Sequence, residues 1–203
     1  MVAIRSASPD DAPAIARVYV ETWRTAYRGI VPASYLAGMS EAAWEGHWRR
    51  VLDDPEGREI LRCVLVAETE VGVVGFATGC REWSGDGAYE GELDDVYVLQ
   101  AHQRHGLGRL LVGGVAGRLG HDGLRSLLVW VADRSPACAF YTALGGTRLD
   151  RGWRRCIGGA TVDVVAYGWR SLSGLRSRET PSFRPHVRPD AAVPLRMEPV
   201  RDL

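Results

Sequence analysis

The spacing of hydrophobic residues changes about halfway along the chain. In the first half, apolar residues recur at helical spacing over residues 8–28 and 40–52, and strand-like stretches follow at 63–67, 71–80 and 89–99. In the second half, helix-like and strand-like stretches alternate, at residues 106–121, 127–131, 137–144, 147–156 and 161–169. With a short strand at residues 2–4, the pattern predicts seven strands and four helices in one α+β domain.

Residues with strong local preferences mark the ends of these elements. Ser8 is expected to cap the first helix, with Pro9 at its first position and an acidic residue three positions after the cap. Gly29 and Pro32 are expected to end that helical stretch. The stretch 127–131 is continuously apolar, as in a strand that is buried on both faces.

The last part of the chain differs in composition from the rest. Residues 171–203 hold five of the ten prolines and six arginines, with little periodicity. The sequence therefore predicts a domain over residues 1–170 and a flexible Pro/Arg-rich tail over 171–203. An arm that packs on a partner subunit is the alternative interpretation of this segment.

Composition and charge exclude several classes of function. The 25 basic residues are all arginines and balance 25 acidic residues, so the formal net charge is zero. This argues against a general binder of nucleic acid or of anionic membranes. No stretch approaches about 18 consecutive apolar residues, so no membrane span is expected. The first residues lack the pattern of a signal peptide, and the expected compartment is the cytoplasm.

The four cysteines, Cys63, Cys80, Cys138 and Cys156, are far apart in the sequence and lie in apolar or strand-like contexts. None forms a C-x-x-C pair or a cluster with histidine at the spacing of metal ligands. They are interpreted as buried, reduced thiols, and no metal site is expected.

The strongest chemical signal is a glycine-rich turn between a strand and an amphipathic helix. It comprises Gln103, Arg104, His105, Gly106, Leu107, Gly108 and Arg109. Main-chain amides at such a helix start suit a phosphate or pyrophosphate, and the charged side chains would add hydrogen bonds. Leu111 occupies the place of the third glycine of G-x-G-x-x-G, and no Gly-Lys-Ser/Thr follows, so both major nucleotide-binding loops are disfavoured. Taken alone, the turn is equally well explained as a plain tight turn.

Several motifs together resemble the GNAT N-acetyltransferase superfamily. The family signature Gln/Arg-x-x-Gly-x-Gly/Ala is matched by Gln103, Gly106 and Gly108. The segments 93–98 and 139–145 are similar to the family's strand before the loop and to its later helix, although Gly146 stands where a Phe is usual. The resemblance covers about residues 1–169. It implies a three-layer fold with a mixed, mainly antiparallel seven-stranded sheet, and a bacterial acetyl-CoA-dependent enzyme.

The resemblance also implies a binding site for acetyl-CoA. The family's pyrophosphate loop maps onto the seven residues 103–109, and its strand contacts to the pantetheine arm map onto the main chain of Val96, Tyr97 and Val98. The family often has Asn seven residues before its tyrosine, where this chain has Arg134. Arg134 would then bind a CoA phosphate, or the contact is absent.

By the same resemblance, Tyr141 would be the acid that protonates the departing thiolate, and the Val98 amide would stabilise the oxyanion. Glu92 matches a position where some members carry a glutamate base, and Asp94, which shares its strand face by alternation, is the alternative base. Two carboxylates on one face raise each other's pKa. The plainer interpretations are that Tyr141 belongs to an apolar helix stripe and that the carboxylates form a solvated strand end.

Trp23, Tyr27 and Trp83 lie on segments that line the acceptor site in the family, although core packing explains Trp23 equally well. The acceptor would be a small-molecule amine or a peptide N-terminus. A homodimer is expected by family habit only.

Two other interpretations stay open. The Pro/Arg-rich tail and Arg134 would suit a catalytically inactive CoA-binding regulatory or interaction module. A different phosphate-ligand protein would bind ATP or NAD in preference to CoA.

Overall fold

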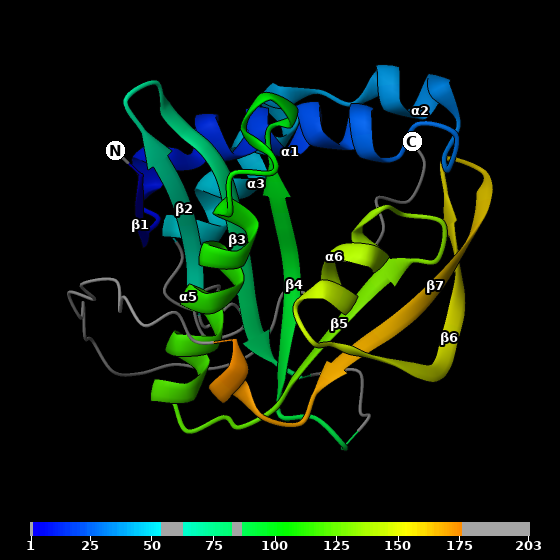
Figure 1. The fold of residues 1–203 in the computed structure, drawn as a ribbon. Helices are drawn as coiled ribbons and strands as arrows, with labels where there is room; N and C mark the ends of the chain where they lie inside the picture. The colour runs from blue at the N-terminus through cyan, green and yellow to red at the C-terminus, as the bar shows by residue number, and fades with distance from the viewer. Residues whose placement is uncertain (1, 54–62, 83–86, 176–203) are drawn as a thin grey trace.

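The computed structural model describes residues 2–53, 63–82 and 87–175 (Figure 1). Its helices are α1 (Ala12–Ala26), α2 (Ala33–Gly38), α3 (Glu41–Asp53), α5 (Leu107–His121) and α6 (Ala137–Ala143), with single 3-10 turns η1 (Pro9–Asp11), η2 (Gln100–His102) and η3 (Leu172–Gly174). Its strands are β1 (Ala3–Ser6), β2 (Cys63–Thr69), β3 (Gly72–Arg81), β4 (Gly91–Val98), β5 (Leu127–Ala132), β6 (Thr147–Ile157) and β7 (Ala160–Trp169).

The seven strands form one sheet in the order β1-β2-β3-β4-β5-β7-β6. Neighbouring strands are antiparallel except β4 and β5, which are parallel. The predicted α+β class and the mainly antiparallel sheet are therefore confirmed. One helix was missed within the described residues: α2 is six residues long and buries only Leu36, which is too little apolar periodicity to detect.

Helices cover both faces of the sheet. The α5 helix lies in front of β2, β3 and β4 in Figure 1, and a Cβ on Gly79 of β3 would collide with Val115 of α5. On the opposite face, the ring of Phe76 in β3 packs 5.1 Å from Trp48 of α3 and 6.4 Å from Tyr19 of α1. The continuous core explains why apolar side chains from both faces of the central strands are buried.

The sheet opens between its two parallel strands. β4 and β5 pair only over Gly91–Leu93 and Leu127–Val129, and beyond these residues the two strands separate, as Figure 1 shows. The register of β4 against β3 shifts in the same region, because Leu93 stands opposite Gly79 whereas Val96 stands opposite Ala77. This bulge increases the local twist and turns the second half of β4 away from its parallel neighbour.

Packing continues a few residues past the last strand. Leu172 and Leu175 are buried in the core, and the Leu172 amide donates a hydrogen bond to the carbonyl of Arg125. The predicted domain boundary at residue 170 thus lies shortly before these contacts. Residues 176–203 lie outside the described residues, so the tail stays a prediction. Within the described part of the chain, no helix has the length and apolar character needed to cross a membrane.

Candidate active site

The glycine-rich turn lies between the end of β4 and the start of α5. The backbone of Arg104 and Gly106 is left-handed, with φ of 66° and 82°, and the helical ladder begins with the bond from the Leu110 amide to the Gly106 carbonyl. The main-chain amides of residues 104–109 have no acceptor among the described residues. Unpaired amides at a helix start, supported by the helix dipole, form a site for an anionic group.

Gln103 has a different part in this turn. Its side-chain amide donates to the carbonyl of Val98 at 2.9 Å, and its main-chain amide donates to the carbonyl of Gln100 at 3.2 Å. Both donors are therefore used within the protein, and they tie the turn to the end of β4. Any contribution of Gln103 to a cofactor site would come through this positioning of the loop.

The turn also brings α5 against α6. A Cβ on Gly108 would lie 3.1 Å from the Phe140 ring, so glycine permits this close approach of the two helices. The predicted phosphate-binding side chains of Arg104, His105 and Arg109 are exposed, as is Arg134 in the turn between β5 and α6. They lie at the two helix starts that border the gap between β4 and β5.

The edge of β4 that faces this gap carries main-chain donors. The amides of Asp95 and Leu99 both point to β3, where they donate to the Thr78 hydroxyl and the Val74 carbonyl at 2.9 Å. Because successive amides of a strand point to opposite edges, the Val96 and Val98 amides point into the gap. The main chain of Tyr97 faces β3 instead, opposite Phe76.

Tyr141 lies on α6 beyond the other border of the gap. Only 6% of it is exposed, and its ring packs 6.0 Å from Tyr167 and 6.1 Å from Trp169. Burial raises the pKa of its phenol, and the neighbouring charges of Tyr27 and Asp95 raise that pKa further. The phenol is therefore protonated at neutral pH, which an acid requires, and it is electrostatically linked to β4 and α1.

Glu92 and Asp94 lie on β4 as predicted, on the face away from α5. Glu92 is 3% exposed and its Oε2 atom has no hydrogen-bond partner among the described residues. Burial, followed by the charges of Asp94 and Glu82, raises the pKa of Glu92 to about 8. Burial also raises the pKa of Asp94, against the opposing effect of Arg155 in β6.

Asp95 is a candidate that the sequence analysis missed. Strict alternation would put Asp95 on the opposite face from Glu92 and Asp94. The bulge changes this, because Thr78 alone stands opposite both Asp94 and Asp95. Leu93 and Val98 face α5, through their partners Gly79 and Gly75, so the two aspartates between them share the other face.

The side chain of Asp95 is buried, with 8% of the residue exposed, and its Oδ2 atom has no hydrogen-bond partner among the described residues. Burial and then the charge of Asp94 raise the pKa of Asp95, and hydrogen bonding with Tyr97 and Thr78 lowers it only in part. The signal that could have revealed it is the Asp-Asp pair between the apolar residues Leu93 and Val96.

An aromatic group stands next to these carboxylates. Trp23 of α1 and Tyr27, which directly follows α1, stack with ring centroids 4.2 Å apart, and the Trp23 indole donates to the Tyr97 hydroxyl at 3.0 Å. Burial raises the pKa of both the Tyr97 and the Tyr27 hydroxyl, and the two hydroxyls influence each other's titration. Trp23 and Tyr27, both predicted to line the acceptor site, thus form one aromatic cluster with Tyr97. Trp83 lies outside the described residues.

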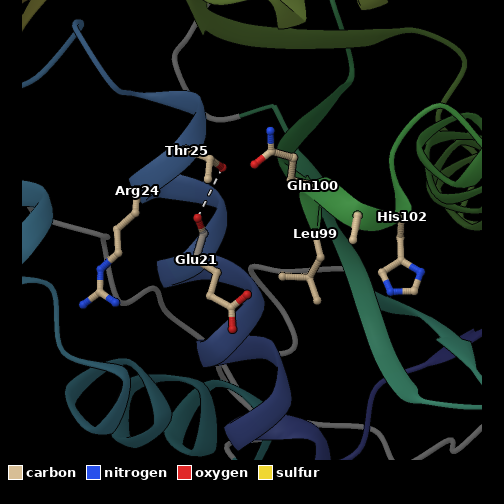
Figure 2. A pocket seen from close by; sticks show the side chains of 7 residues that line it. Glu21, Arg24, Thr25, Leu99, Gln100 and His102 are labelled. Atoms are coloured by element: carbon tan, nitrogen blue, oxygen red, sulfur yellow. Dashed lines mark hydrogen bonds between the residues drawn. The ribbon is translucent and has the colours of Figure 1, made fainter.

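A separate cavity of about 610 Å³ lies between α1 and the segment that follows β4 (Figure 2). It is lined by Glu21, Arg24, Thr25, Leu99, Gln100, Ala101 and His102. Arg24 donates to the carbonyls of Leu36 and Met39, and the Thr25 hydroxyl donates to carbonyls within α1. None of the predicted site residues lines this cavity, so we place the candidate active site at the gap beside β4.

The described residues contain no group of three or more His, Cys, Asp or Glu side chains that could hold a metal ion.

Comparison with known proteins gives a consistent family relationship. A family model described as the acetyltransferase (GNAT) family matches residues 17–145. The chain is 35% identical over 178 residues to the uncharacterized N-acetyltransferase YuaI of Bacillus subtilis (strain 168), in an alignment that covers 87% of this chain and 98% of that protein.

Solved structures share the fold. The PaiA N-acetyltransferase from Thermoplasma acidophilum, in complex with coenzyme A, is similar with a TM-score of 0.67 and 15% identity, over 83% of this chain and 99% of that chain. YncA from Salmonella typhimurium, solved with its cofactor acetyl-CoA, is similar with a TM-score of 0.58 and 22% identity, over 89% of this chain and 98% of that chain. At these identities the likeness concerns the fold.

Proposed function

The chain belongs to the acetyltransferase (GNAT) family, and we propose that it moves the acetyl group of acetyl-CoA to a primary amine by direct attack. One observation carries the proposal. Main-chain amides without an acceptor among the described residues border the gap between β4 and β5, and a buried tyrosine stands at the far side of the same gap. Two proteins of similar fold were solved with coenzyme A or acetyl-CoA.

The amides of residues 104–109 would bind the pyrophosphate of acetyl-CoA, and Arg104, His105, Arg109 and Arg134 would contact its phosphates from exposed positions. The pantetheine arm would then run along the open edge of β4, where Val96 and Val98 offer their amides. This arrangement puts the thioester next to Val98, whose amide would donate to the carbonyl oxygen as negative charge develops there.

Transfer begins when the lone pair of the neutral amine forms a bond to the thioester carbon. The carbon–sulfur bond then breaks, and its electron pair leaves with the sulfur. Tyr141 would give its phenolic proton to that sulfur, which is consistent with a raised pKa that keeps the phenol protonated. The acceptor would be a small-molecule amine or a peptide N-terminus that enters beside Trp23 and Tyr27.

The amine's surplus proton requires a base on the carboxylate-bearing face of β4. Glu92 is the candidate from the sequence, and its pKa of about 8 suits proton uptake near neutral pH. However, six residues of regular strand separate Glu92 from Val98, which is a distance of about 20 Å. Glu92 would therefore have to act through intervening water, whereas Asp95 is only three residues from Val98.

The activity is tested by following thiol release from acetyl-CoA in the presence of propylamine, butane-1,4-diamine and glycine methyl ester, with calorimetric binding of acetyl-CoA as a parallel measurement. Binding with amine-dependent thiol release supports the proposal. Binding without turnover of any amine favours the inactive CoA-binding module. Absence of both excludes an acetyl-CoA site in the gap.

A further inference from the structure

We propose that Asp95 is the group that finally accepts the proton of the acceptor amine, and that the Tyr97 hydroxyl passes the proton to it. This inference rests on the proposed acetyl transfer, and it assigns a role to two side chains of the same site.

Asp95 lies nearer than Glu92 to Val98, where the thioester would be held. The bulge of β4 turns its carboxylate to the face that carries Tyr97, opposite Thr78, and away from α5. Its distance from Val98 is three residues, or about 10 Å of strand, which is half that of Glu92. The charge of Asp95 influences the titration of Tyr27 and Tyr141, on the two sides of the site, so the carboxylate lies near both.

One carboxylate oxygen of Asp95 lacks a hydrogen-bond partner within the described part of the chain. The Asp95 Oδ2 atom is buried and has no hydrogen-bond partner among the described residues. A buried carboxylate oxygen without a partner costs free energy, which is tolerated where the group has a chemical task. With one oxygen free of hydrogen bonds to the described residues, the carboxylate can change its protonation state without breaking a hydrogen bond that the fold requires.

The contacts and the exposure of Tyr97 suit its hydroxyl to carry a proton. Its hydroxyl accepts a hydrogen bond from the Trp23 indole at 3.0 Å, so its own proton must point elsewhere. The Tyr27 hydroxyl and the Asp95 carboxylate lie close enough to this hydroxyl to influence its titration. Asp95 is buried, whereas Tyr97 is only partly buried, so Tyr97 is the more accessible of the two. Tyr97 is thus the side chain that connects the acceptor to the carboxylate.

The proton transfers balance over one turnover. As the nitrogen–carbon bond forms, the amine proton moves to the Tyr97 oxygen while the Tyr97 proton moves to Asp95. Tyr141 loses its proton to the departing sulfur. Exchange with solvent then removes the proton from Asp95 and restores one to Tyr141, so both residues return to their starting states.

Several titratable groups face Asp95 and set its proton affinity. They are Asp94 and Tyr97 on β4, Tyr19 on α1, Tyr27 directly after α1, Tyr141 on α6 and Arg155 on β6. Because the Asp94 charge raises the pKa of Asp95, Asp94→Asn should shift the acid limb of the kcat/KM profile to lower pH.

The test compares Asp95→Asn, Tyr97→Phe and their combination with the wild-type enzyme, using acetyl-CoA and the best acceptor among propylamine, butane-1,4-diamine and glycine methyl ester. We expect Asp95→Asn to lower kcat by about 100-fold or more and to abolish the acid limb of the pH profile. The calorimetric Kd for acetyl-CoA should stay within about twofold, which also shows that the variant is folded. The double variant should lose no more than the worse single variant, since the two residues act as one unit.

Asp95→Glu supplies the conservative comparison and should recover part of the rate and the acid limb. Glu92→Gln tests the alternative base, which lies on the same face of β4 as Asp95. If Glu92→Gln abolishes the acid limb while Asp95→Asn retains it, the inference is overturned. A wild-type enzyme that turns over none of the amines overturns the proposed function, and the role of Asp95 with it. An active wild type with an equally active Asp95→Asn variant overturns the role of Asp95 alone.

Discussion

The two sides of β4 differ in which atoms they offer. The edge that faces β5 offers main-chain amides, those of Val96 and Val98, and these continue into the amides of residues 104–109. The face toward α1 offers side chains, namely the carboxylates of β4 and the ring cluster around Tyr97. The edge of β4 that faces β5 would hold acetyl-CoA, which is the same for every acceptor. The face of β4 toward α1 would contact the acceptor.

The main-chain edge and the side-chain face of β4 should respond differently to substitution. A site of main-chain amides depends on backbone conformation, so most side chains around it can vary while its ligand stays the same. A site of side chains depends on the identity of each residue, and it is where acceptor preference is set. The edge should therefore control affinity for acetyl-CoA, and the face and Tyr141 should control the rate of transfer.

The largest effect on the rate is expected at Tyr141, which lies on α6 across the gap from β4. Tyr141→Phe removes the proposed acid and should lower kcat by about 100-fold or more, because the departing thiolate loses its proton donor. The Kd for acetyl-CoA should change by less than about twofold, since no main-chain donor is altered. Steady-state kinetics and calorimetry measure the two quantities.

The matched control is Tyr167→Phe, whose ring lies 6.0 Å from that of Tyr141. Because Tyr167 has no part in the proposed chemistry, its kcat should stay within about threefold of the wild type. Equal losses of kcat in both variants would mean that Tyr141 serves packing alone.

A smaller effect is expected when the main chain of the glycine-rich turn is altered. It should concern the affinity for acetyl-CoA and not the rate of transfer. Gly106 has φ of 82°, and a Cβ added there would meet no atom within 4 Å, so Gly106→Ala alters backbone preference without a clash. A left-handed alanine costs about 1–2 kcal/mol, which predicts a Kd for acetyl-CoA that is roughly tenfold weaker.

Gly117→Ala is the matched control in the same helix, because its added Cβ also meets no atom within 4 Å and its backbone is ordinary helix. Its Kd for acetyl-CoA should equal that of the wild type, and its stability should be slightly higher. Comparable loss of affinity in both variants would contradict a role for the loop backbone.

A third effect, on stability and not on catalysis, is expected on the side-chain face of β4. The Glu92 carboxyl has a pKa of about 8 in the fold against an ordinary value of 4.5. As pH rises from 4.5 to 8, the carboxyl ionises in the unfolded chain first, so the stability that its neutral form provides is lost. Glu92→Gln removes this dependence, and its advantage over the wild type should be larger at pH 9 than at pH 5 by about 4 kcal/mol.

Urea unfolding at the two pH values measures this difference. Glu90→Gln is the control, because hydrogen bonding with Arg125 lowers the pKa of Glu90. Its contribution to stability is therefore present at high pH and lost as pH falls, which is the opposite direction. A pH-independent difference between Glu92→Gln and wild type would contradict a buried, neutral Glu92.

The main-chain side could largely be predicted from the sequence. Gly106 and Gly108 mark a left-handed residue and a close helix contact, and both conditions select glycine. Likewise, the long apolar stretches predicted the strands and the longer helices of the sheet. The short α2 escaped detection, because one buried leucine in six residues gives no periodicity.

The side-chain face could be predicted only in part. Alternation along β4 put Glu92 and Asp94 on one face and excluded Asp95, because a bulge leaves no reliable mark in a single sequence. The hydrogen bond between Trp23 and Tyr97 joins residues 74 positions apart, so no local pattern contains it. Such contacts depend on how α1 crosses the sheet, which is a property of the whole fold.

The most direct test of the account is the response of individual main-chain amides to acetyl-CoA, followed by ¹⁵N–¹H correlation spectra during a titration. The account predicts that the largest shifts fall on the amides of residues 104–109 and on those of Val96 and Val98, while the amides of Asp95 and Leu99, which already donate to β3, shift little. Saturable shifts that leave residues 104–109 and Val98 unaffected would contradict it.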